Sequence, residues 1–136
     1  MWALVTGASS GIGRDMARYL YSLGYSIVIV ARDEKKLEEL KQELEKNNSK
    51  NINNNENTNF EIEKANLKLD KTNEVTKQQI IVISEDLSNV ENCKELYEKT
   101  KHIEIDLLVN NAGFGVFGNF SETDLEKEIN LINTNI

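Results

Sequence analysis

The chain has few of the features that define several large classes of protein. Among its 136 residues there is no proline and one cysteine, Cys93. A single cysteine excludes an internal disulfide and a cysteine-rich metal site, and this usage fits the reducing cytoplasm. No apolar run approaches the roughly 20 residues that span a bilayer, and the run before Gly7 is too short for a signal-peptide core. We therefore expect a cytoplasmic protein without a membrane segment.

Positive charge is scarce as well. The chain carries 16 Lys and Arg residues against 23 Asp and Glu residues, which gives a net charge of −7 and a pI near 4.8. This balance argues against a dedicated nucleic-acid binder and against binding to anionic membranes. The length suits one domain of ordinary size, and 39% apolar residues are enough to build a core.

Apolar segments of two kinds alternate along the chain. Continuous, partly β-branched runs indicate buried strands at residues 2–6, 25–31, 80–83 and 105–109. Apolar residues at helical spacing indicate helices at residues 12–24, 33–46, 90–102 and from 125 onward. Strands that alternate with helices predict an α/β fold, a doubly wound, Rossmann-like parallel sheet with strand order 3-2-1-4.

The last two helices have start signals in the sequence. Ser88 with Glu91, and Ser121 with Asp124, give the spacing of a capping box. The inner face of the third helix is predicted from the apolar residues Val90, Cys93, Leu96 and Tyr97. That of the fourth is predicted from Leu125, Ile129, Ile132 and Ile136.

Residues 47–78 differ in composition from the rest of the chain. They are rich in asparagine, lysine and glutamate and have few large apolar side chains. Such a segment cannot bury enough surface to offset the entropy of ordering it. We expect one domain over residues 1–136, interrupted here by a flexible insertion, although alternating apolar residues between Phe60 and Leu69 also fit a weak ribbon.

A glycine-rich turn joins the first expected strand to the first expected helix, with the sequence Thr6-Gly7-Ala8-Ser9-Ser10-Gly11-Ile12-Gly13. A diphosphate against the amino end of a helix needs backbone without a Cβ in the way. The alternating pattern around the turn favours dinucleotide binding over a purely conformational use of glycine. The serines add hydroxyl donors for the phosphates or the ribose. Candidate cofactor-binding residues are therefore Gly7, Ser9, Ser10, Gly11, Ile12 and Gly13.

The spacing T-G-x-x-x-G-x-G differs from the G-x-G-x-x-G of long-chain dehydrogenases and resembles the hallmark of the short-chain dehydrogenase/reductase family. A second family hallmark follows the fourth expected strand as Asn110-Asn111-Ala112-Gly113. The resemblance covers the chain outside residues 47–78. It implies that Asp86 and Leu87 contact adenine, that Asn110 ties its strand to neighbouring elements, and that Ala112 and Gly113 lie beside the adenosine and ribose.

The choice of cofactor depends on the end of the second expected strand. An NAD site usually has an acid there for the two ribose hydroxyls, whereas a 2′-phosphate needs a cation. The chain has Arg32 at or one past that position, and a guanidinium binds phosphate through two charge-assisted bonds. Resemblance to NADP-preferring members favours NADP over NAD. Asp33 keeps NAD open through a shift of one residue, and Arg32 also fits a solvated residue at a helix start.

The same resemblance implies a catalytic tyrosine with a lysine four residues later, a serine and an asparagine. The literal tyrosine–lysine pattern occurs once, at Tyr97 and Lys101, but before the second hallmark instead of after it. We interpret Tyr97 as a core residue. Asn133-Thr134-Asn135-Ile136 resembles the family segment with the catalytic asparagine, so Asn135 is the one catalytic candidate and would hold a water for proton relay.

We therefore expect the amino-terminal part of an NADP-dependent oxidoreductase that acts on a small carbonyl or secondary alcohol, inactive by itself and without its C-terminal strands. The resemblance implies a homo-oligomer for the full-length protein, and no metal site is expected. The alternatives are a non-catalytic dinucleotide-binding module, half of a split enzyme completed by a partner chain, and a degraded gene product. Phe114, Phe117 and Phe120 fit either core packing or the wall of a substrate cleft.

Overall fold

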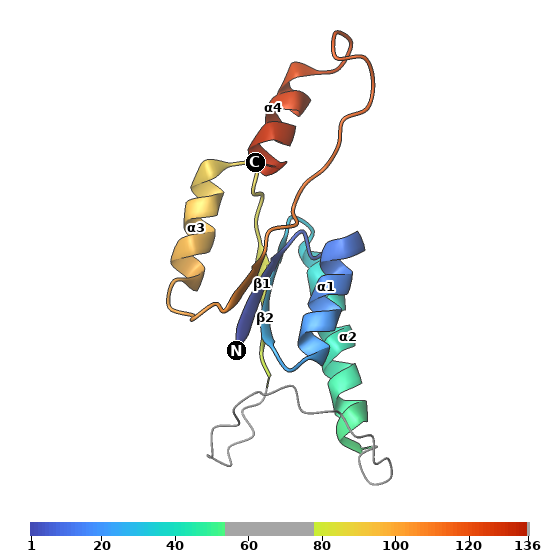
Figure 1. The fold of residues 1–136 in the computed structure, drawn as a ribbon, viewed down its shortest axis with the longest axis vertical. Helices are drawn as coiled ribbons and strands as arrows, with labels where there is room; N and C mark the ends of the chain where they lie inside the picture. The colour runs from blue at the N-terminus through green and yellow to red at the C-terminus, as the bar shows by residue number, and fades with distance from the viewer. Residues whose placement is uncertain (54–77, 136) are drawn as a thin grey trace.

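Strands and helices alternate along the chain in the computed structural model, which describes residues 1–53 and 78–135 (Figure 1). The strands are β1 (Trp2–Thr6), β2 (Ser26–Ala31), β3 (Ile80–Ser84) and β4 (Leu107–Val109). The helices are α1 (Gly11–Ser22), α2 (Glu34–Asn53), α3 (Val90–Thr100) and α4 (Leu125–Asn135). The strands form one parallel sheet in the order β3-β2-β1-β4. The predicted Rossmann-like sheet and its strand order are confirmed.

The two central strands are buried on both faces, which explains why their sequences are continuously apolar. On one face, Val5 and Ile29 pack with the helical residues Leu37 and Leu40, and all four side chains are fully buried. On the other face, alternate strand residues pack with Leu96 of α3. Helices α1 and α2 therefore cover one side of the sheet and α3 covers the other (Figure 1).

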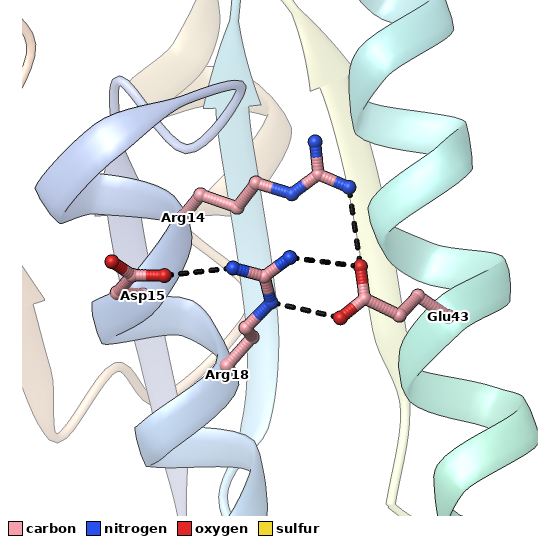
Figure 2. A network of polar contacts seen from close by, with 4 residues as sticks. All are labelled: Arg14, Asp15, Arg18 and Glu43. Atoms are coloured by element: carbon pink, nitrogen blue, oxygen red, sulfur yellow. Dashed lines mark hydrogen bonds and ion pairs between the residues drawn. The ribbon is translucent and has the colours of Figure 1, made fainter.

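Helices α1 and α2 are joined by a network of ion pairs (Figure 2). Arg18 donates from Nε and Nη2 to the two carboxylate oxygens of Glu43, at 2.8 and 3.0 Å, and Arg14 Nη2 lies 3.1 Å from the same carboxylate. Asp15 pairs with the remaining Arg18 nitrogen, Nη1, at 2.7 Å. The Arg18 bonds hold the pKa of Glu43 below its usual value, with a smaller contribution from Arg14. The network fixes the relative position of two helices whose amino ends border the site described below.

Several predicted helix boundaries need correction. Helix α2 continues past its predicted end near Lys46 to Asn53, and residues 54–77 of the predicted insertion lie outside the described residues. The amino end of α3 is capped by Asn89, whose side chain accepts the N–H of Glu91. The capping box predicted from Ser88 is therefore wrong, because the Ser88 hydroxyl donates to Asp86 instead.

The predicted inner face of α3 is wrong for most of its residues. Leu96 is buried, but Val90, Cys93 and Tyr97 are exposed, and Tyr97 is 65% accessible. They stay exposed because, within the described residues, β4 is the edge of the sheet and nothing lies beyond it to cover them. Tyr97 and Leu108 instead line an open, mainly apolar groove of about 590 Å³.

Helix α4 extends beyond the carboxyl ends of the strands (Figure 1) and has no buried residue. The predicted apolar stripe of this helix faces solvent at Leu125, Ile129 and Ile132, while Ile136 lies outside the described residues. Asp124 caps the helix by accepting the N–H of Lys127 at 3.2 Å. Across residues 1–53 and 78–135, no helix has the length and apolar character needed to cross a membrane.

Candidate cofactor site

The glycines of the β1–α1 turn are required by close contacts and by backbone conformation. A Cβ on Gly13 would lie 2.4 Å from the carbonyl oxygen of Gly7, and a Cβ on Gly7 would lie 2.7 Å from Nδ2 of Asn111. Gly7 and Gly11 also have positive φ angles, +69° and +54°, which side chains disfavour. A Cβ on Gly11 would meet nothing within 4 Å. Two glycines therefore allow close packing, and the third leaves the mouth of the turn open.

The amino end of α1 offers unused hydrogen-bond donors. The first-turn N–H groups of a helix have no intrahelical acceptor. Ser10 is the N-cap residue, but its side chain makes no capping bond to them. These groups, at the positive end of the helix dipole, together with the Ser10 hydroxyl, suit an anion. A diphosphate fits this arrangement of donors.

Thr6 joins the ends of β1 and β4 beneath this turn. Its buried hydroxyl oxygen accepts the backbone N–H groups of Asn111 and Ala112, both at 2.9 Å. The side-chain amide of Asn111 donates to the Thr6 carbonyl at 3.1 Å, and Oδ1 of Asn110 lies 3.4 Å from the Thr6 hydroxyl. The two motifs that the sequence places far apart are thus bonded to each other.

Asp86 follows β3 at the same edge of the sheet. Its Oδ1 accepts both the backbone N–H and the hydroxyl of Ser88, at 3.0 and 2.8 Å. The backbone bond is the main reason that the pKa of Asp86 is lowered, and the positive charge of Arg32 adds to the effect. The carboxylate is therefore ionised at neutral pH and keeps Oδ2 for a ligand donor.

Five charged residues, 32–36, follow β2, and three of them border the site. Arg32 is exposed, and within the described residues its guanidinium makes no hydrogen bond or ion pair, although its charge acts on Asp86. Asp33 accepts the backbone N–H of Lys36 at Oδ1, at 3.1 Å, while the Lys36 ammonium lies 3.3 Å from Oδ2. The backbone bond is the largest cause of the lowered pKa of Asp33. Asp33 is thus bonded within its own helix turn, whereas the guanidinium of Arg32 is free to meet a ligand.

These groups border a single cavity of about 530 Å³, a size typical of small-molecule sites. It brings together most of the predicted residues: Gly7, Ser9, Ser10, Ile12, Arg32, Asp86, Leu87, Ala112 and Gly113. The other predicted residues, Gly11, Gly13, Asn110 and Asn135, support the surrounding turns without lining it. Within the described parts of the chain, no cluster of His, Cys, Asp or Glu suits a metal ion.

The cavity also has lining residues that were not among the predicted cofactor-binding residues, including Asn111, Lys36 and Thr134. Phe114, for which the sequence left both core packing and the wall of a cleft open, lines the cavity as well. Lys36 lies one helical turn after Arg32, so the 3.6-residue repeat of a helix starting there was a usable signal. Thr134 had no comparable signal, because it reaches the cavity only through the attachment of α4 to the loop after β4. Phe117 and Phe120 are 95% and 78% exposed, so their interpretation as core residues is wrong.

Asn135 reaches the loop beside the cavity. Its side-chain Oδ1 accepts the backbone N–H of Phe114 at 3.1 Å, and its Nδ2 donates to the Phe114 carbonyl at 3.0 Å. A Cβ on Gly113 would lie 2.7 Å from the same Oδ1. The two hydrogen bonds between Asn135 and Phe114 attach the carboxyl end of α4 to the wall of the cavity.

The pattern of the short chain dehydrogenase family matches residues 1–64 and 52–136, which together span the chain. The chain belongs to the short-chain dehydrogenase family. It is 28% identical, over 97% of its length, to the dehydrogenase/reductase SDR family member 7B of Xenopus laevis, of which it covers 34%.

Solved structures of this family share the fold. One is the bulky-bulky ketone specific alcohol dehydrogenase of Comamonas testosteroni, with a TM-score of 0.73, 28% identity and 98% of this chain aligned to 43% of that one. Another is a metagenomic short-chain oxidoreductase in complex with NADP, with a TM-score of 0.73, 28% identity and all of this chain aligned to 50% of that one. The chain thus spans between a third and a half of the length of these relatives.

Tyr97 and Lys101, which have the tyrosine–lysine spacing typical of the short-chain dehydrogenase family, lie away from the cavity. Tyr97 is on the exposed face of α3 and lines the apolar groove instead. Lys101 is paired with Glu98 on the same stretch of chain. Neither residue borders the cavity, so the pair has no access to a ligand bound there.

Proposed function

We propose that this chain is the cofactor-binding part of an NADP(H)-dependent oxidoreductase that interconverts a carbonyl and a secondary alcohol. The observation that carries the proposal is the cavity of about 530 Å³, which is bordered by the glycine turn, the Asp86 turn and the Asn111–Phe114 loop. A bound nicotinamide dinucleotide supplies or accepts a hydride. The NADP complex of the metagenomic relative supports this ligand class.

Each group around the cavity has a proposed part in holding the dinucleotide. The open amino end of α1 and the Ser10 hydroxyl bind the diphosphate. The free Oδ2 of Asp86 accepts from the amino group of adenine, and Leu87 packs against the ring. Arg32 binds the 2′-phosphate through its unpaired guanidinium, which favours NADP over NAD.

The oxidoreductase chemistry requires residues beyond those assembled here. Asn135 is the one catalytic candidate, and both polar atoms of its side chain are bonded to Phe114. We propose that the acid–base tyrosine and lysine belong to the remaining length of a longer protein, and that residues 1–136 form an incomplete domain with an insertion near 47–78. The position of Tyr97 outside the cavity favours one second candidate, a dinucleotide-binding module without catalysis.

Binding and chemistry are tested separately. We expect NADPH fluorescence to change saturably when the 136-residue chain is added, and NADH to bind more weakly; absence of saturation at millimolar NADPH contradicts the binding proposal. The DNA after codon 136 tests the chemistry. A strand, a serine and a tyrosine–lysine pair encoded there support an oxidoreductase, and their absence in every frame leaves the binding module.

A further inference from the structure

The segment that follows β2 concentrates positive charge on an acidic chain. Residues 32–36 read Arg-Asp-Glu-Lys-Lys, with three cations and two anions, while the whole chain carries a net charge of −7. Of the three cations, Arg32 and Lys36 line the cavity and Lys35 does not. Of the two anions, Asp33 lines it and Glu34 does not. Two cations and one anion of this segment therefore border the cavity.

Asp33 is occupied by Lys36 on both of its oxygens. Oδ1 accepts the backbone N–H of Lys36, and Oδ2 lies 3.3 Å from its ammonium. Both side chains of this pair are about half exposed, at 53% for Lys36 and 44% for Asp33. An ion pair this exposed is weak and exchanges readily with other partners. A dianion at the cavity therefore competes effectively with Asp33 for the ammonium.

We propose that Lys36 is a second phosphate-binding cation of the site, and that Asp33 is the counter-ion that the phosphate displaces. The ligand group is a phosphate monoester on the adenosine ribose, so this inference rests on the proposed function. Arg32 and Lys36 bind it from two directions, Arg32 through its planar guanidinium and Lys36 as a point charge. Asp33 also lines the cavity, but Oδ1 of its carboxylate caps α2, and we assign it no contact with the ribose hydroxyls.

The test uses ligands that contain only the adenosine half of the cofactor. Binding of 2′,5′-ADP and of 5′-AMP to the full chain is measured by titration calorimetry. We expect Lys36→Gln to weaken 2′,5′-ADP about tenfold, the usual size for one lost charge-assisted contact, and to leave 5′-AMP unchanged. Lys36→Arg, which keeps the charge, retains most of the affinity.

Lys35→Gln is the matched control. It removes the same charge from the next position of the same helix, but its side chain does not line the cavity. Equal weakening of 2′,5′-ADP by Lys35→Gln and Lys36→Gln overturns the inference, since it indicates a general field effect. Equal affinity of the unaltered chain for 5′-AMP and 2′,5′-ADP overturns it too, while the dinucleotide site stands. Binding of neither ligand refutes the proposed function itself.

Asp33→Asn separates the two roles of the acid. Asparagine caps a helix as well as aspartate does, so the fold is preserved while the negative charge is removed. We expect 5′-AMP binding to be unchanged and 2′,5′-ADP binding to become severalfold tighter, because Lys36 is released and repulsion of the phosphate ends. Weaker binding of 5′-AMP would show that Asp33 contacts the ribose and would overturn the counter-ion role.

Discussion

Asn135 is bonded through its side-chain amide to both polar groups of the Phe114 backbone, with distances of 3.1 Å to the N–H and 3.0 Å to the carbonyl. The amide accepts one hydrogen bond and donates another, as the backbone of a neighbouring strand would, and it joins the carboxyl end of α4 to the loop after β4. Because Phe114 and Thr134 both line the cavity, this contact sets the shape of one wall.

Asn135→Ala should loosen this wall. Without the amide, the N–H of Phe114 loses its acceptor, and we expect its hydrogen exchange, followed by NMR, to become at least tenfold faster, in line with the loss of about 1.4 kcal/mol. Asn133→Ala is the control, because Asn133 is exposed on the same helix and no bond of its side chain is recorded among the described residues. Equal protection of the Phe114 N–H in both variants would show that the Asn135 amide does not hold this loop.

Thr6 is a second point at which one side chain connects the two motifs. Thr6→Val keeps the shape of the side chain but leaves the N–H groups of Asn111 and Ala112 without their acceptor. We expect the free energy of unfolding to fall by about 2 kcal/mol, measured by urea titration. Thr6→Ser retains the hydroxyl and should lose much less. A valine variant as stable as the serine variant would show that water replaces the hydroxyl.

Local patterns in the sequence were sufficient to predict the two central strands, β1 and β2, and the glycine turn after β1. The runs of β1 and β2 are apolar without interruption because both faces of these strands are buried, and this property is readable without knowing the partners. The glycine turn was equally readable from its spacing after a strand and before a helix, although Gly7 and Gly13 also pack against Asn111, which lies far away in the sequence. Strand order followed from the handedness of the crossovers.

Other features depended on contacts that the sequence does not encode locally. Tyr97 has the spacing of a core residue, yet burial requires a covering element, and none lies there in the described residues. The role of Ser88 was misread because its hydroxyl found a nearer acceptor in Asp86. Lys36 borders the cavity because α2 returns to the same side one turn after Arg32, and this position depends on where the helix begins, which the residues after β2 do not define locally.

The ion pairs of Glu43 predict an acid-sensitive contact between α1 and α2. The pKa of Glu43 is lowered in the folded chain, chiefly by Arg18. The pair therefore stabilises the fold above the ordinary carboxyl pKa, and this stabilisation is lost as the pH falls through the lowered value. Because the side chains are about one third exposed, the contribution is about 1 kcal/mol.

Glu43→Gln should reveal this contribution by its pH dependence. We expect the variant to be less stable than the unaltered chain at pH 7, and the difference to disappear as the pH falls below the lowered pKa of Glu43, where the carboxyl is protonated in both the folded and unfolded states. Urea unfolding across this range measures the difference. Glu39→Gln is the control, because no ion pair of Glu39 is recorded among the described residues. A pH-independent loss in the Glu43 variant would indicate a packing effect instead of a charge effect.

Gly11 and Gly24 allow backbone strain to be separated from cofactor binding. Both have positive φ angles, +54° and +96°, and a Cβ on either would meet nothing within 4 Å. Alanine at each position should therefore cost a similar free energy of unfolding, about 1 kcal/mol, through backbone strain alone.

Gly11, however, lies between Ser10 and Ile12, which both line the cavity, while Gly24 ends the turn after α1. We expect Gly11→Ala to weaken NADPH about tenfold or more by placing a methyl group among the phosphate-binding N–H groups. Gly24→Ala should leave NADPH affinity unchanged at equal loss of stability. If both variants weaken NADPH to the same extent, the effect comes from general destabilisation, and the α1 amino end is not the diphosphate site.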